Sequence, residues 1–133
     1  MASTLIEQDP GLIATGGFTE EGGYKAMQRL LGARSFSAVF AANDLSAVGL
    51  ISALAEHGHR VPENVSVVGF DDLRLSAYTT PPLTTIRQPA AEIAERATQL
   101  LLDLTHGKEV HQQLHLLEPE LVVRGSTRAL DSS

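Results

Sequence analysis

Short apolar runs alternate along the chain with longer segments in which apolar residues recur at helical spacing. The runs at residues 38–42, 65–70 and 83–86 predict strands, and a weaker run at 12–14 predicts another. Residues 38–42 are apolar without interruption, which is typical of a strand buried on both faces. Strands that alternate with helices in this way indicate βαβ units and a parallel sheet.

Capping residues mark the ends of the predicted helices. Thr19 is expected to cap a first helix that Gly32 ends, and Asn43 and Asp44 open a second helix that ends near Gly58. A short helix is expected at 73–78, before the Pro81-Pro82 pair, and Pro89 starts another.

Residues 90–107 have the clearest helical periodicity. Two strand-like segments follow at 114–117 and 121–123, and the polar tail after Thr127 is expected to fray. The helix carries a single apolar stripe made by Ile93, Ala97, Leu100, Leu101 and Leu104.

Composition narrows the classes of protein that fit this pattern. The 133 residues suffice for one domain, and 43% of them are hydrophobic, as in a globular protein. The chain has no cysteine, no secretory leader and no apolar stretch of membrane-spanning length, so we expect a cytoplasmic protein with no membrane partner. A net charge of -6 and the absence of a basic cluster argue against DNA binding by this chain itself.

Polar and aromatic side chains follow the predicted strands at their carboxyl ends, where ligands bind in open α/β sheets. Phe18, Asn43, Asp71 and Gln88 occupy these positions, and together they suit a neutral polyhydroxylated ligand. The alternative for an Asn-Asp pair before a helix is simple N-capping. We expect the capping role for Asp44, and for Asp72 either a cap or a solvated charge.

Catalytic and metal-binding signatures are absent from the sequence. It contains no nucleophile elbow, dinucleotide fingerprint, phosphate loop or zinc-protease motif, and we predict no catalytic residue and no cofactor. The five histidines lack the spacing of metal ligands, so no metal site is expected. Adjacent carboxylates such as Asp71 and Asp72 point apart at a strand end and do not readily flank one bond.

Several distinctive motifs occur in a fixed order between about Asp9 and Thr127. They are AVFAANDLSAVGLISALAEHGHRVPENVSVVGFDD, YTTPPLTTIRQP, the long helix and LVVRGST. In this combination the chain closely resembles the C-terminal part of LacI/GalR-type transcriptional regulators. The resemblance implies an α/β fold with a parallel-sheet three-layer sandwich, the C-terminal part of a type I periplasmic-binding-protein-like domain whose two subdomains close on a small molecule.

The resemblance also assigns roles to individual residues. Phe18 matches an aromatic that stacks on the effector, Asn43 a hydroxyl-binding asparagine and Asp71 a ligand-accepting aspartate, whereas Ala90 stands where some relatives have an aromatic wall. A pocket arginine of the family would lie upstream of the matched segment. The surface that pairs two effector domains maps to Val48, Ile51, Leu75 and Tyr78, for which ordinary core packing is the alternative.

The resulting domain prediction is a partial effector-binding and dimerisation domain at 1–127 and a disordered tail at 128–133. The helix at 90–107 would pack on the other subdomain in relatives, so we expect its stripe to lack a partner here and to drive homodimerisation or exchange of elements. Light scattering that finds only monomer at high concentration would exclude this association.

We predict that the chain is the effector-sensing and dimerisation segment of a ligand-responsive bacterial repressor. Such a protein would control DNA binding by a helix-turn-helix domain that is absent from these residues. The effector would be a small sugar-like or nucleoside-like molecule, and the protein would not be an enzyme. The alternative is a segment of a sugar-binding receptor of an ABC uptake system, and a sugar-processing enzyme on the same fold ranks last. The upstream gene sequence discriminates the first two, because it would encode a helix-turn-helix or a signal peptide.

Overall fold

The computed structural model describes residues 8–111 and 114–131. Within this part of the chain no helix combines the length and the apolar character that a membrane crossing requires. The helices and strands, in chain order, are the 3-10 helix η1 (Pro10–Leu12), α1 (Glu20–Leu31), β1 (Ala38–Phe40), α2 (Asp44–Glu56), β2 (Ser66–Val68), the 3-10 helix η2 (Arg74–Ala77), β3 (Thr85–Arg87), α3 (Ala90–Thr105) and β4 (Glu120–Val122).

The strands form two short pairs that bridges join edge to edge. β1 and β2 are parallel, with Val39 opposite Val67, and β3 and β4 are antiparallel. Parallel bridges link Val68 to Thr84 and Asp71 to Arg87, so that β3 lies beside β2. The α/β class with a parallel sheet, expected from the alternating pattern, is therefore confirmed.

The helices begin and end where the capping residues predict. The Thr19 hydroxyl accepts a hydrogen bond from the Gly22 N–H at the start of α1, and Gly32 is the C-cap of that helix. α2 ends at Glu56, just before Gly58, which has a positive φ of 78°. Local hydrogen bonding thus sets these boundaries, as the sequence indicated.

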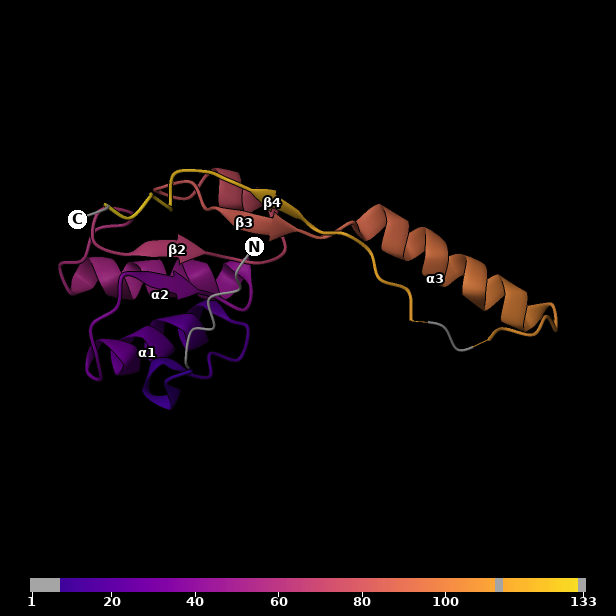
Figure 1. Ribbon diagram of the computed structural model, residues 1–133, viewed down its shortest axis with the longest axis horizontal. Coiled ribbons are helices and arrows are strands. Elements are labelled where there is room, and N and C mark those ends of the chain that lie inside the picture. Colours follow the sequence, from indigo (N-terminus) through magenta and orange to yellow (C-terminus); the bar gives the residue numbers. More distant parts are fainter. Residues whose placement is uncertain (1–7, 112–113, 132–133) are drawn as a thin grey trace.

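α1 and α2 pack against each other beneath the sheet and supply most of the core (Figure 1). Two glycines permit this close crossing, because a Cβ at Gly23 would lie 2.1 Å from the Ser46 carbonyl oxygen and one at Gly49 would lie 1.8 Å from that of Glu20. The core that results contains Met27, Ala41, Ala47, Leu50, Ala53, Leu54, Val65, Val67 and Leu83.

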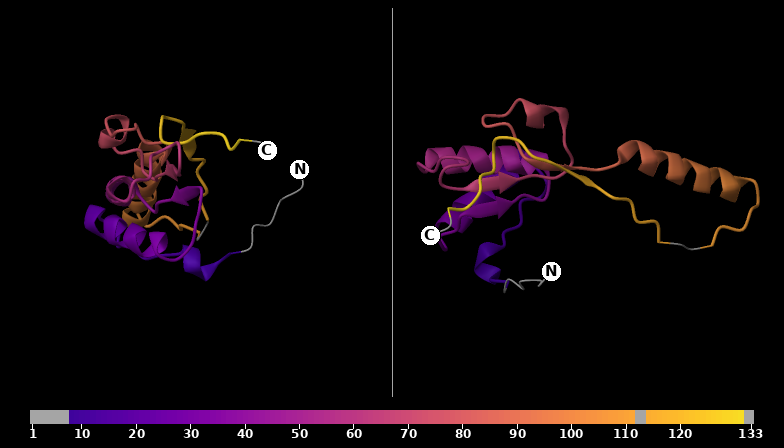
Figure 2. Two further views of the ribbon diagram at one scale, coloured as in Figure 1. Left: turned by 90° about the vertical axis from the view of Figure 1, so that its left-hand side faces the viewer. Right: turned by 45° about the horizontal axis from the view of Figure 1, so that its top comes forward.

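α3 protrudes from this body, and the chain leaves and returns through β3 and β4 (Figures 1 and 2). No described residue of α3 is buried, and Leu101 and Leu104 are 62% and 58% exposed. The apolar stripe predicted for residues 90–107 is therefore not covered by any described part of the chain.

Three predicted strand features are wrong. Residues 12–14 form no strand, because no strand in the described part of the chain pairs with this segment, and Ile13 is largely exposed. Residues 114–117 are also not a strand; Leu114 and Leu116 face solvent there, and 112–113 lie outside the described residues. β1 is not buried on both faces, because the sheet is covered mainly by α1 and α2, which leaves Phe40 62% exposed.

The short helix predicted at 73–78 is present as the 3-10 helix η2. Near the C-terminus Arg128 Nε donates to the carbonyl oxygens of Pro62 and Glu63 at 3.1 and 3.0 Å.

Candidate functional site

Phe18 and Asn43 are joined by a hydrogen bond at the carboxyl end of β1. Asn43 is the N-cap of α2, because its Oδ1 accepts from the Ser46 N–H at 2.9 Å. Its Nδ2 donates to the carbonyl oxygen of Phe18, also at 2.9 Å. The amide therefore caps the helix and holds the Phe18 backbone at a positive φ of 60°, while the aromatic ring stays 65% exposed.

Asp71 and Gln88 form the second pair, beyond the ends of β2 and β3. Gln88 Nε2 donates to Asp71 Oδ1 at 2.7 Å, and the Asp71 N–H donates to the Ile86 carbonyl oxygen at 2.9 Å. Asp71 Oδ2 accepts no hydrogen bond from the residues that the structure describes. One carboxylate oxygen is thus available to a ligand hydroxyl or amine.

The two pairs lie along one edge of the sheet. The Asp44 N–H donates to the Phe70 carbonyl oxygen at 2.9 Å, which ties the start of α2 to the residue before Asp71. An aromatic face, an amide, a carboxylate and a second amide therefore follow one another along this edge. Such a set can hydrogen-bond a neutral ligand and stack against its ring.

The prediction that Asp44 caps a helix is wrong, because Asn43 is the N-cap of α2. The Asp44 carboxylate is fully buried and accepts three hydrogen bonds from a distant part of the chain. The donors are the Leu73 N–H at 2.8 Å, the Ser76 hydroxyl at 2.6 Å and the Thr85 hydroxyl at 2.5 Å. Asp44 thereby holds the segment that follows Asp71, a role that no local pattern signals.

Asp72 is neither a cap nor a solvated charge. Its Oδ2 accepts from Arg87 Nε and its Oδ1 from Arg124 Nη2, both at 2.7 Å, and its side chain is only 9% exposed. Burial would raise the pKa of this carboxyl, but the hydrogen bonds and charges of Arg124 and Arg87 outweigh burial and hold the pKa below its usual range. An arginine inside the apolar run LVVRG was the one available signal of this pairing.

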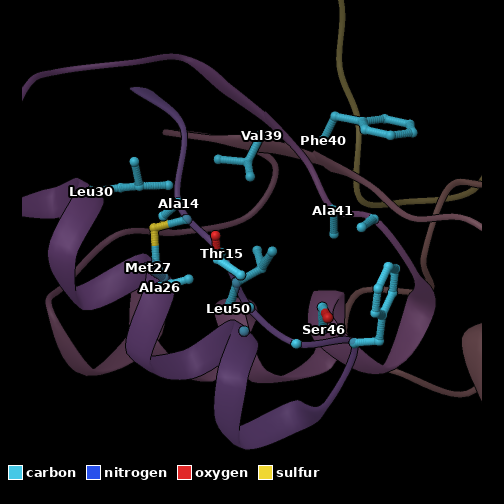
Figure 3. A pocket seen from close by; sticks show the side chains of 15 residues that line it. Ala14, Thr15, Ala26, Met27, Leu30, Val39, Phe40, Ala41, Ser46 and Leu50 are labelled. Carbon is cyan, nitrogen blue, oxygen red and sulfur yellow. The ribbon is translucent and has the colours of Figure 1, made fainter. Parts of the chain in front are cut away.

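A cavity of about 240 Å³ lies between residues 14–18, α1 and β1 (Figure 3). Its walls are mostly apolar, with Met27 and Leu50 among them, and of the four candidate ligand residues only Phe18 lines it. The Ser46 hydroxyl at this cavity is buried and has no hydrogen-bond partner in the described part of the chain. The other three candidates lie outside this hollow, along the sheet edge.

The four residues assigned to a dimer surface differ in exposure. Val48 and Ile51 on α2 are half-buried, and Ile51 packs against the core. Leu75 and Tyr78, near η2, are 38% and 77% exposed. Core packing thus accounts for part of the α2 pair, whereas the Leu75 and Tyr78 side chains are accessible to a partner.

The histidines do not gather at this edge. Among residues 8–111 and 114–131 no group of three or more His, Asp or Glu side chains is placed to hold a metal ion. His57 Nδ1 lies 2.8 Å from the Ala53 carbonyl oxygen at the end of α2, and His115 Nδ1 lies 3.5 Å from Arg96. These contacts fit local roles at helix surfaces.

The fold and the edge site define the class of protein. Residues 2–127 match the model of the periplasmic binding protein-like domain, and the chain belongs to that family. The resemblance to LacI/GalR-type regulators is confirmed by relatives of known name. The chain is 47% identical over 126 residues to the HTH-type transcriptional repressor CytR of Escherichia coli K12. The aligned residues make up 94% of this chain and 37% of CytR.

Solved structures of regulators share the fold. The transcriptional regulator CelR in complex with cellobiose superposes with a TM-score of 0.86 at 38% identity, over 91% of this chain and 37% of that one. The lac repressor dimer bound to operator and the anti-inducer ONPF gives a TM-score of 0.78 at 36% identity, over 86% of this chain and 40% of that one. The chain therefore spans well under half the length of these relatives, and the relatives are transcriptional regulators rather than uptake receptors.

Proposed function

We propose that this chain is the effector-sensing part of a bacterial LacI-type repressor, which acts in the cytoplasm on DNA through a domain outside these residues. The observation that carries the proposal is the edge on which Asn43 pairs with Phe18 and Asp71 pairs with Gln88. The named regulators, which match more than four fifths of the chain, support it.

The effector that suits this edge is a small sugar-like or nucleoside-like molecule. Asp71 Oδ2 offers an acceptor for a hydroxyl, Gln88 is exposed beside it, and the Phe18 ring provides an apolar face for a sugar or base. Cellobiose in the CelR complex belongs to the first of these classes. Effector binding would act by population shift, favouring one arrangement of the subdomains over another.

The test is a binding screen of the complete gene product against ribose, cellobiose, adenosine and cytidine, followed by titration calorimetry of any compound that raises the melting temperature. Asp71→Asn is expected to weaken such a compound at least tenfold, because it removes about 1.4 kcal/mol or more of charge-assisted hydrogen bonding. Asn43→Ser is also expected to weaken it, since serine keeps the helix cap but lacks the amide.

A control variant separates loss of contact from loss of fold. Asp9→Asn removes an exposed ion pair with Arg34 in the N-terminal segment and should leave the affinity unchanged. If Asp71→Asn and Asn43→Ser bind the compound as tightly as the Asp9→Asn control, the site assignment is wrong.

A homodimer is the second part of the proposal. The lac repressor relative was solved as a dimer, and here Leu75 and Tyr78 are exposed while Val48 and Ile51 are half-buried. Tyr78→Lys is expected to weaken dimerisation of the complete gene product in sedimentation analysis. Arg74→Glu, an exposed change on the same turn, serves as the control, and equal dimer affinities for the two variants would overturn this interface.

A further inference from the structure

The Asp72 carboxylate binds an arginine at the end of each of the two strands, β3 and β4, that connect α3 to the rest of the molecule. Arg87 is the last residue of β3, which leads into α3, and Arg124 lies just after β4, by which the chain returns. Asp72 binds one arginine with each carboxylate oxygen, both at 2.7 Å. One side chain therefore ties both connections to the loop that follows β2.

Arg124 also contacts the sheet backbone. While its Nη2 binds Asp72, its Nη1 donates to the Leu83 carbonyl oxygen at 3.0 Å, ahead of β3. Its side chain is 19% exposed, against 50% for Arg87, which also lies 3.5 Å from Glu120 on β4. The Asp72–Arg124 pair is thus the more buried half of the arrangement.

The loop that carries Asp72 also carries Asp71, and its backbone is strained. Asp71 has a φ of 120° and Asp72 a φ of 57°, values in the region that favours glycine. Non-glycine residues stay there only where surrounding contacts hold them. The two arginines on Asp72 and the hydrogen bond from Gln88 to Asp71 supply such contacts from a single strand end and its neighbour.

We propose that Asp72 is a positioning residue that couples Asp71 to the orientation of α3 through Arg87 and Arg124. The role of Asp71 as an effector contact rests on the proposed function, whereas the link that Asp72 makes between the two strands does not. A ligand hydroxyl that donates to Asp71 Oδ2, beside the Gln88 hydrogen bond to Oδ1, would move the loop, and the Asp72 carboxylate would carry that movement to β3 and β4 together.

The positioning of α3 by Asp72 is testable on this chain without any effector. Because the sequence has no cysteine, Arg29→Cys on α1 and Thr98→Cys on α3 give two unique spin-label sites, and dilution with unlabelled chain suppresses distances between molecules. Double electron–electron resonance should show one narrow peak for the distance between the two labels in the parent. Asp72→Asn is expected to lose that peak in favour of a broad distribution, and Arg124→Met should do the same.

Two controls make this measurement decisive. Asp9→Asn removes a remote ion pair, and Ser126→Ala removes buried hydrogen bonds to Thr84 and Val67 in the same sheet without touching Asp72. Both should keep the narrow peak. If Asp72→Asn keeps it as well, or if Ser126→Ala loses it equally, the positioning role is overturned.

The coupling to the site is tested in the complete gene product with whichever of ribose, cellobiose, adenosine or cytidine binds. Hydrogen exchange should show that the compound changes protection of α3, and Asp72→Asn should abolish that change at a compound concentration that saturates the variant. An unaltered exchange response in Asp72→Asn would overturn the coupling. If no compound in the set binds, the proposed function fails for these classes, and the resonance experiment still decides whether Asp72 positions the strands.

Discussion

α2 and α3 have similar lengths and opposite environments. α2 buries seven of its 13 residues against α1 and the sheet, whereas none of the 16 residues of α3 is buried. Leu50 is 4% exposed on α2, while Leu101 is 62% exposed on α3. Apolar residues at helical spacing thus identify a face that requires burial, but the partner of that face is not encoded in the helix.

The two helices should therefore respond differently to mutation. Changes in α2 should alter the free energy of unfolding, because its contacts lie within the chain. Changes on the apolar stripe of α3 should instead alter association, because that stripe has no partner among the described residues.

The largest effect is expected at the first residue of α2. Asp44→Ala leaves three donors without their acceptor, among them the Leu73 N–H and the Ser76 hydroxyl, and should lower the free energy of unfolding by about 4 kcal/mol. Asp44→Asn should recover at least half of this loss, because the amide keeps one oxygen and can donate to the Thr85 hydroxyl. Urea unfolding followed by circular dichroism measures both; equal losses would refute the hydrogen-bond explanation.

A somewhat smaller effect is expected where α2 crosses α1. Gly49→Ala places a Cβ 1.8 Å from the Glu20 carbonyl oxygen unless the helices separate, which should cost about 3 kcal/mol. Gly32→Ala is the matched control, because its nearest contact would be an ordinary 3.6 Å and its φ is −79°. The same urea titration should show little change in Gly32→Ala; similar losses in both variants would mean that the crossing is not tightly packed.

The ion pairs of Asp72 with Arg87 and Arg124 should make an intermediate, pH-dependent contribution to the free energy of unfolding. Its pKa is lowered in the folded state, so its contribution is present above the ordinary carboxyl pKa of about 4 and is lost as the pH falls through the lower folded value. Asp72→Asn should cost about 2 kcal/mol at neutral pH, between exposed and buried ion pairs. Unfolding measured from pH 7 down to pH 3 should show parent and variant converging; a constant gap would contradict the assignment.

The smallest effect on stability is expected on α3, together with a clear effect on association. Leu101→Lys combined with Leu104→Lys should change the free energy of unfolding of the monomer by less than about 0.5 kcal/mol, because both side chains are exposed. Light scattering at high concentration should nevertheless show less self-association than in the parent. Glu95→Lys and Thr98→Lys on exposed positions form the control pair, and a parent that stays monomeric would refute association through the stripe.

Local signals predicted the parts of the fold that depend on neighbouring residues. Thr19 and Asn43 cap their helices, and the Gly32 and Gly58 stops lie where expected, because each depends on hydrogen bonds a few residues apart. The failures at 12–14 and 114–117 have the opposite cause. A strand exists only if another strand pairs with it, and periodicity does not reveal whether that partner is present.

The candidate ligand residues were located by the rule that strand ends share one edge, and their roles as effector contacts remain predictions. What the rule did not reveal is how the edge is held together. Asp44 was expected to cap a helix and Asp72 to cap or be solvated, yet each binds groups from a distant segment. A carboxylate next to a helix start looks alike in both cases, because only burial and the donors brought to it distinguish them.

The sequence alone was enough to predict the order of the main helices, the α/β class, the family and the positions of Asn43, Asp71 and Gln88 after successive strands. The folded chain was needed to show that Asp44 is buried and that Asp72 links two strands. The physical reason is separation along the chain: Thr85 lies 41 residues from Asp44 and Arg124 lies 52 from Asp72. Helical and strand periods report burial over a few residues, whereas these contacts exist only after the sheet has assembled.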